Sequence, residues 1–180
     1  MLHIRILHES DSKDLLQFEL ENRKYFAASI SDRGDDYFSN FGIVLSDDIK
    51  DQTRGERRFY LALNSSGDIV GRVNLYDIGM RANLGTASLG YRFGERFCGK
   101  GYATFAVSLV CEKAKHELNI DQLKAMVAVQ NVGSQRVLEK TGFLVTDGTP
   151  THFESNGKSV EAIHCPMLTE VFYMAFHNVR

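Results

Sequence analysis

Cysteine is scarce in this chain of 180 residues, which contains only Cys98, Cys111 and Cys165. Their number is odd and no two of them are spaced Cys-x-x-Cys, so the sequence lacks the pattern of a disulfide framework and that of a zinc site. The six histidines include no His-x-x-x-His pair either. We therefore expect no disulfide framework and no bound metal ion.

Long apolar runs are absent as well. No stretch of about eighteen consecutive apolar residues occurs, and the N-terminus has no apolar run behind a positively charged segment. Such patterns would mark a membrane span or a secretory signal peptide. We therefore expect a cytoplasmic protein that does not engage a membrane.

The sequence also lacks an excess of basic residues and a Pro/Ser-rich linker. Its formal net charge is −2, whereas non-specific binding to a nucleic-acid backbone relies on basic surfaces. Direct nucleic-acid binding is therefore not expected. The 43% hydrophobic content suits one sizeable core, and we expect a single domain over residues 1–180.

Hydrophobic periodicity predicts both strands and helices. Apolar and polar residues alternate in the expected strands, and apolar residues recur every three or four positions in the expected helices. Strands are expected at residues 2–7, 58–63, 69–76, 87–93, 123–129, 151–155 and 158–168. Helices are expected at residues 11–26, around 37–41, from 103 onward and after 134. This order is typical of the α+β class.

Two glycines separate the strand expected at 87–93 from the helix that follows it. Gly99 and Gly101 have no Cβ, so the backbone there can turn sharply and let an anion approach the first N–H groups of the helix. Arg96 and Lys100 add positive charge. Taken alone, the pattern is more typical of a solvated turn than of a phosphate site.

A second segment changes this interpretation. Asn131–Phe143 follows the strand expected at 123–129 with an Asn-x-x-Ser pattern, a short helix and a Glu-Lys-x-Gly-Phe ending. Together, and in this order, the two segments resemble the acetyl-CoA-binding core of the GNAT N-acetyltransferases. The second segment, with its Asn-x-x-Ser pattern and the helix that ends in Glu-Lys-x-Gly-Phe, resembles most the RimJ/RimL branch, which acetylates the N-termini of ribosomal proteins. The resemblance runs from about Ile4 to the last expected strand.

The resemblance implies a fold, a reaction and a cofactor site. The fold would be a GNAT fold with a mixed, mostly antiparallel sheet that splays open at the acetyl-CoA site and helices on both faces. The reaction would move an acetyl group from acetyl-CoA to a primary amine, the N-terminal α-amine of a protein by resemblance to that branch. Polyamines and antibiotic-like small amines stay open as acceptors, and so does a homodimer. The cofactor contacts implied are Tyr91, Arg92, Phe93, Arg96, Gly99, Lys100, Gly101, Tyr102, Ala103, Thr104, Asn131 and Ser134.

The chain departs from the family pattern at the expected proton donor. Many GNAT enzymes carry a tyrosine just before the Lys-x-Gly-Phe ending, but here the position is Leu138, which has no proton to give. Ser134 is then the nearest hydroxyl in the motif, and it could instead cap the helix. Ser88 stands where the branch often has a glutamate. These departures keep open a catalytically silent module that only binds coenzyme A.

A base for the amine is suggested by a predicted hairpin. If Asn156-Gly157 forms a two-residue turn, His152 and Glu161 face each other across the strands. A histidine oriented by a carboxylate can accept a proton near neutral pH. The alternative is an exposed hairpin whose polar residues form only salt bridges.

The glycine pattern is also compatible with a third class, the nucleotide-dependent redox enzymes. Gly99-Lys100-Gly101 also begins a Gly-x-Gly-x-x-Gly pattern, but the sixth position is Thr104. The strand that follows ends at Gln130 rather than at an acidic residue for the ribose hydroxyls. The sequence therefore disfavours a dinucleotide site.

Overall fold

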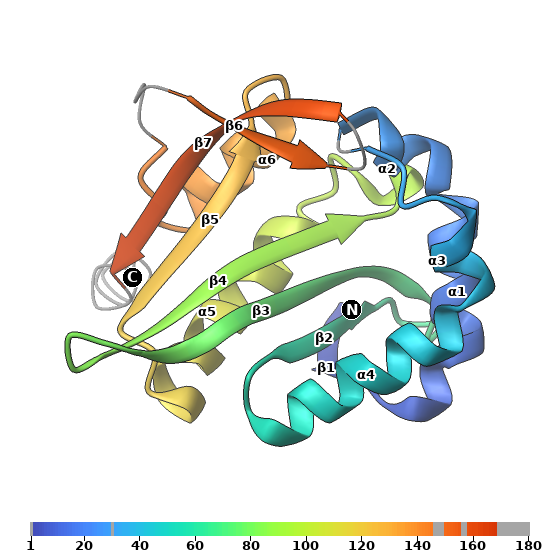
Figure 1. Ribbon diagram of the computed structural model, residues 1–180, viewed down its shortest axis with the longest axis horizontal. Coiled ribbons are helices and arrows are strands. Elements are labelled where there is room, and N and C mark those ends of the chain that lie inside the picture. The colour runs from blue at the N-terminus through green and yellow to red at the C-terminus, as the bar shows by residue number, and fades with distance from the viewer. Residues whose placement is uncertain (1, 30, 146–149, 156–157, 169–180) are drawn as a thin grey trace.

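The computed structural model describes residues 2–29, 31–145, 150–155 and 158–168 (Figure 1). In this part of the chain one seven-stranded sheet has the order β1-β2-β3-β4-β5-β7-β6. Its strands are β1 (His3–Ile6), β2 (Arg58–Leu63), β3 (Ile69–Arg81), β4 (Leu84–Phe93), β5 (Gln122–Ala128), β6 (Thr151–Ser155) and β7 (Lys158–Leu168). The helices are α1 (Ser12–Glu21), α2 (Arg23–Ser29), α3 (Asp35–Ser39), α4 (Phe41–Arg54), α5 (Tyr102–Leu118) and α6 (Val132–Lys140).

Neighbouring strands are antiparallel except β4 and β5, which are parallel. The α+β class and the mixed, mostly antiparallel sheet are therefore confirmed. None of the helices described here is long and apolar enough to cross a membrane.

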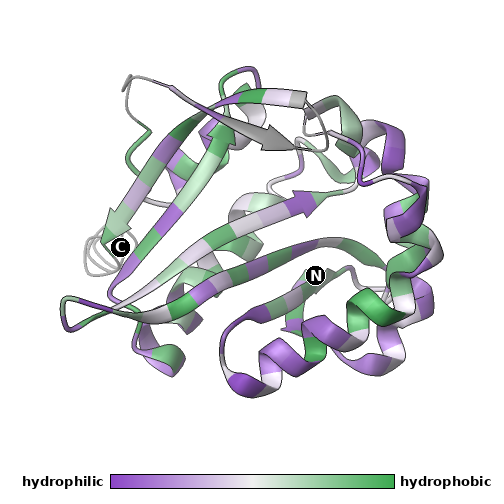
Figure 2. Cartoon of the chain, in the orientation of Figure 1, coloured by the Kyte–Doolittle hydropathy of each residue, from purple (hydrophilic) through white to green (hydrophobic). Residues whose placement is uncertain are grey.

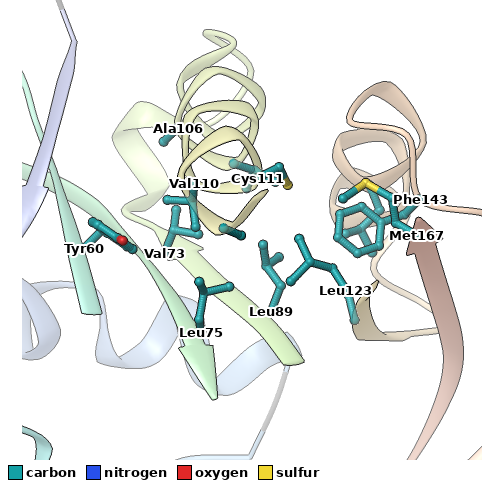
Figure 3. Packing of buried hydrophobic residues seen from close by; sticks show 14 of the residues in the cluster. Tyr60, Val73, Leu75, Leu89, Ala106, Val110, Cys111, Leu123, Phe143 and Met167 are labelled. Atoms are coloured by element: carbon teal, nitrogen blue, oxygen red, sulfur yellow. The ribbon is translucent and has the colours of Figure 1, made fainter. Parts of the chain in front are cut away.

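Helices cover both faces of the sheet. Helix α5 lies against β3 and β4 on one face, and α1 and α4 contact β3 and β2 on the other. A core under α5 and α6 buries Val73, Leu89 and Val110, as Figure 3 shows in part. A second core buries Leu15 of α1 and Leu61 of β2. Each such side chain stabilises the fold by about 1.5–3 kcal/mol.

Strand β3 is buried on both faces from Ile69 to Leu75. Figure 2 shows hydrophilic and hydrophobic residues alternating along it. Val73 and Leu75 point into the core with α5. The polar residues Arg72 and Asn74 therefore lie on the opposite face, where each is less than 5% exposed.

The helix predicted at residues 11–26 is in fact two helices, α1 and α2. The break is at Asn22, whose side-chain N–H donates to the Phe18 carbonyl at 2.8 Å. Its side-chain oxygen accepts the backbone N–H of Glu95 at 3.0 Å. Because a residue distant in sequence supplies that second bond, local periodicity could not predict the break.

The β3–β4 hairpin is longer than predicted. Strand β3 continues to Arg81, and Ala82 and Asn83 form the turn with positive φ angles of 50° and 64°. Asparagine tolerates this conformation, but alanine rarely adopts it. The turn therefore gave no clear sequence signal.

The sheet opens between β4 and β5, as the resemblance implied. Their parallel pairing begins at Thr86↔Gln122 and ends at Leu89↔Ala125. Beyond that point β4 continues to Phe93 and β5 to Ala128 without pairing to each other, and Figure 1 shows the two strands diverging. The gap places the end of β4 and the start of α6 around one space.

Candidate active site

A cavity of about 640 Å³ lies at the carboxyl end of β4. It extends from α2 to the loop before α5 and to the first turns of α6. Ten of the predicted cofactor contacts are among its lining residues, namely Tyr91, Arg92, Phe93, Gly99, Gly101, Tyr102, Ala103, Thr104, Asn131 and Ser134. The structure therefore brings the two sequence motifs together at one site.

The glycine loop has the backbone shape that the sequence suggested. Gly99 and Gly101 have φ angles of 72° and 78°, a left-handed conformation that favours glycine. A Cβ built on either residue would meet no atom within 4 Å. The space beside both glycines is therefore open to a ligand.

Helix α5 begins directly after this loop. Its first intrahelical bond runs from the Phe105 N–H to the Gly101 carbonyl, at 3.0 Å. The N–H groups of Tyr102, Ala103 and Thr104 precede that bond, so the helix offers them no acceptor. Such N–H groups, together with the helix dipole, suit a phosphate group, as the sequence predicts for this loop.

The two basic residues of the loop lie at its margin. The Arg96 guanidinium is 4.7 Å from the centre of the Phe97 ring, and the Lys100 ammonium is 5.9 Å from the same centre. Neither basic residue is among the described residues that line the cavity. Their contribution is therefore positive charge near the phosphate site, and their direct contact with the coenzyme stays a prediction.

The start of α6 joins the second motif to β4. The Asn131 side chain caps the helix by accepting the Ser134 N–H at 3.0 Å. The capping role that the sequence left open for Ser134 therefore belongs to Asn131. The Ser134 hydroxyl is instead 2.7 Å from the Tyr91 hydroxyl, which also donates to the Ser134 carbonyl at 3.0 Å.

Tyr91 is a protonated partner for this serine. Burial raises the pKa of the Tyr91 phenol well above its usual range, although the hydrogen bond to Ser134 partly opposes the shift. The phenol therefore keeps its proton at neutral pH. Leu138, by contrast, is 1% exposed and belongs to the core under α5 and α6, so its position serves packing.

A second, smaller cavity of about 220 Å³ lies in the gap of the sheet. It is lined by residues of β3, β4 and β5 and by the start of α6. Tyr91, Arg92, Asn131 and Ser134 line both cavities. The two spaces therefore meet at the Tyr91–Ser134 pair, which is where a reaction between two substrates could occur.

The backbone of β4 presents an N–H group to this gap. Gly94 donates to the Val70 carbonyl of the β3 side at 3.0 Å, and hydrogen-bonded pairs alternate along an antiparallel ladder. The N–H of Arg92 therefore points toward β3 and that of Tyr91 points toward β5. Since the β4–β5 ladder ends at Leu89, the Tyr91 N–H faces the gap and can stabilise negative charge on a carbonyl oxygen.

A buried ionic cluster borders both cavities, and the sequence analysis missed it. The Glu19 carboxylate, 1% exposed, lies 3.1 Å from Arg72 Nε and 2.9 Å from a terminal nitrogen of Arg92. The Arg72 contact is not aligned as a hydrogen bond. Glu19 follows Leu15 by four residues on the buried stripe of α1, and that position was a signal for a buried charge.

Electrostatics in this cluster keep Glu19 ionised. Burial raises the pKa of Glu19, but the combined attraction by the charged groups around it, Arg72 and Arg92 foremost, outweighs that effect. The pKa of Glu19 therefore lies below its usual value. Burial lowers the pKa of Arg92 to about 10, with Glu19 opposing the shift. The Arg92 guanidinium is therefore tied to Glu19 of α1, while Arg92 also lines the larger cavity.

The predicted pairing of His152 with Glu161 is confirmed in the β6–β7 register. The turn at 156–157 lies outside the described residues. Both side chains are exposed, no hydrogen bond between them is present in the described part of the chain, and neither lines the two cavities described above. Glu161 is an even number of positions from Cys165 and Met167 along β7, so the three side chains lie on one face of the sheet. Cys165 and Met167 lie in the core with α5, and His152 and Glu161 are therefore on that face. The catalytic role of this pair stays a prediction.

Comparison with known proteins identifies the family. The model for the acetyltransferase (GNAT) domain matches residues 2–144, and the chain belongs to this family. The probable N-acetyltransferase YjcK of Bacillus subtilis (strain 168) is 33% identical over 145 residues, which cover 79% of this chain and 80% of that protein. The protein is therefore a GNAT N-acetyltransferase of the RimJ/RimL type.

Solved structures show the same fold at low sequence identity. The ribosomal-protein-S5-alanine acetyltransferase of Vibrio fischeri has a TM-score of 0.84 with 18% identity, over 94% of this chain and 93% of that one. RimL, the ribosomal L7/L12 α-N-protein acetyltransferase, in complex with coenzyme A has a TM-score of 0.81 with 19% identity, over 93% of each chain. The spermidine N-acetyltransferase of Vibrio cholerae with coenzyme A and spermine has a TM-score of 0.77 with 18% identity, over 96% of this chain and 98% of that one.

Replacing Gly101 by valine should weaken acetyl-CoA binding by about tenfold or more. The branched side chain would occupy the open space beside the phosphate site, and a β-branched residue is strained at the φ of 78°. Calorimetric titration with acetyl-CoA measures the loss. Gly67→Val is the matched control, because Gly67 also has a positive φ and an open Cβ direction but does not line either cavity. If a folded Gly101→Val protein bound acetyl-CoA with the affinity of the wild type, the loop would not be part of the coenzyme site.

Proposed function

We propose that this enzyme acetylates the α-amine at the N-terminus of a protein, with acetyl-CoA as the acetyl donor. GNAT enzymes use acetyl-CoA, and structural neighbours were solved with coenzyme A. The observation that carries the proposal is the meeting of the two cavities at Tyr91 and Ser134. The larger cavity suits the coenzyme, and the smaller one is reached from the gap of the sheet.

The residues around the gap suit an aminolysis reaction. A neutral amine forms a C–N bond with the thioester carbonyl carbon, the C–S bond breaks, the amine loses one proton and the thiolate gains one. We assign the Tyr91 N–H to the carbonyl oxygen, where negative charge develops. Ser134 donates the proton to the thiolate, and the protonated Tyr91 phenol can replenish it through their 2.7 Å contact.

His152 is proposed to accept the proton of the amine. Because its exposed side chain lies outside the described lining of both cavities, we assign this transfer to intervening water. Glu161, its cross-strand partner, would stabilise the charged imidazole. A solvent-linked base is weak, so it suits an amine that is partly neutral already.

The α-amine fits this requirement better than a polyamine does. Its pKa of about 7.7–8.0 leaves roughly a tenth of it neutral near pH 7, whereas an amine with a pKa near 10.4 is almost fully charged. Three acidic residues of α4 and of the segment before it, which could otherwise attract a polycation, also form ion pairs within the chain. Asp32 and Asp35 form ion pairs with Arg23, and Asp47 pairs with Lys50.

A panel of acceptors tests the proposal by release of free thiol from acetyl-CoA. Peptides that start with Ser or Ala should be turned over faster than spermidine and aminoglycosides. The same peptides with blocked N-termini are the matched controls and should release no thiol above background. Faster turnover of spermidine than of every peptide would contradict the acceptor. If no amine caused release of thiol from acetyl-CoA, the protein would be a module that binds coenzyme A without catalysing acetyl transfer.

A further inference from the structure

Asn74 lies at the smaller cavity, on the opposite side of the sheet from the coenzyme loop. Its neighbours Val73 and Leu75 pack under α5, so strand alternation places Asn74 on the other face. Its cross-strand partner on β4 is Gly90. A Cβ at Gly90 would lie 3.1 Å from the Tyr76 ring, so the glycine leaves room for that ring beside Asn74.

The amide of Asn74 is only half satisfied. The side chain is 3% exposed, and its Nδ2 donates to the Tyr76 hydroxyl at 2.7 Å. Its Oδ1 has no hydrogen-bond partner among the residues that the structure describes. A buried acceptor without a partner destabilises a fold, so this oxygen indicates a ligand with a donor group.

The position of Asn74 relates this oxygen to the reaction. Asn74, Tyr91 and Ser134 line the same cavity of about 220 Å³, and the latter two also line the coenzyme cavity. The thioester would therefore reach the gap from one side and the acceptor from the side of Asn74. The described lining includes Arg72 and Arg92 but no carboxylate, so it suits a neutral amine better than an ammonium ion.

We propose that Asn74 Oδ1 binds the acceptor amine and sets its orientation. The oxygen accepts one N–H of the neutral amine, which leaves the nitrogen lone pair free to form the C–N bond while the C–S bond breaks. The other amine proton leaves to the base, and Ser134 supplies the proton of the thiol. Tyr76 is a positioning residue, because its hydroxyl holds the amide in place. This inference rests on the proposed aminolysis but not on the identity of the amine.

The test compares Asn74→Leu with Tyr76→Phe, using the amine that the wild-type enzyme acetylates best in the acceptor panel. Asn74→Leu should raise the KM for that amine by about tenfold or more, with an unchanged Kd for acetyl-CoA. Its melting temperature should equal or exceed that of the wild type, because the variant removes a buried oxygen without a partner. Tyr76→Phe keeps the oxygen and should change the KM much less.

A different result is expected if Asn74 has only a structural role. If its role were only to hold Tyr76, the two variants would have equal effects on KM, on acetyl-CoA affinity and on melting temperature, and the proposal would be overturned. Asn74→Ala is the second variant if Asn74→Leu does not fold, and an unchanged KM in it would also overturn the proposal. Turnover of a small amine instead of peptides would contradict the proposed acceptor only, and Asn74 would be tested with that amine. A wild-type enzyme inactive with every amine would overturn both.

Discussion

Turnover by a Ser134→Ala enzyme should fall by about 10³-fold at neutral pH. The hydroxyl lies where the two cavities meet and contacts the Tyr91 phenol. In the proposed mechanism, its removal leaves the departing thiolate without its proton donor. Because that proton is needed by the leaving group, the loss should persist as the pH rises. Acetyl-CoA affinity should change little, since the Asn131 cap bonds the backbone of residue 134 rather than its hydroxyl.

The pH profile separates this role from that of His152. Rates of His152→Ala should also fall at neutral pH, but the deficit should shrink toward about pH 9.5, where an α-amine of pKa about 8 is neutral without a base. Steady-state kcat and KM across that range measure both variants. The control is Ser88→Ala, whose hydroxyl bonds Asp77 at 2.9 Å outside both cavities. A Ser134→Ala enzyme as active as this control would exclude the serine as proton donor. Wild-type rates for His152→Ala would exclude His152 as the base and leave the β6–β7 hairpin with a structural role only.

The backbone shapes of the glycine loop and of the start of α6 were predictable because each depends on neighbouring residues. A glycine pair before a helix and an Asn-x-x-Ser cap determine short stretches of backbone, whatever the rest of the chain does. The structure adds which groups they present, such as the Asn131 cap that frees the Ser134 hydroxyl for Tyr91. The β6–β7 register was also predictable, since a two-residue turn sets the pairing of both strands.

The ionic and amide groups of the sheet were not predictable in the same way. Glu19 meets Arg72 and Arg92 from more than fifty positions away in the chain, and no local pattern relates them. Asn74 sits between valine and leucine in a run that reads as an ordinary strand. Its half-satisfied amide becomes visible only when the neighbouring strands are in place. The proposed acceptor side of the site therefore depends on tertiary packing, whereas the loop proposed to bind the coenzyme is shaped by neighbouring residues.

Replacing Glu19 by alanine should lower the free energy of unfolding by about 3–5 kcal/mol, the usual cost of breaking a buried ion pair from one side. The variant leaves Arg72, which is 4% exposed, without its nearest counter-charge and opens space beneath α1. Chemical denaturation at neutral pH measures the loss. Glu117→Ala is the matched control, because Glu117 is a helical glutamate whose pair with Lys113 is largely exposed and should contribute about 0–1 kcal/mol.

The contribution of Glu19 to the free energy of unfolding should also depend on pH, in a direction that its pKa determines. The folded-state pKa of Glu19 is lowered, so its contribution is fully present above the unfolded value of about 4.3 and is lost as the pH falls through the lower folded value. Wild-type stability should therefore fall more steeply in acid than that of Glu19→Gln, whose neutral amide does not titrate. Parallel acid profiles, or a Glu19→Ala protein no less stable than Glu117→Ala, would mean that the two arginines are held by α1 through packing alone.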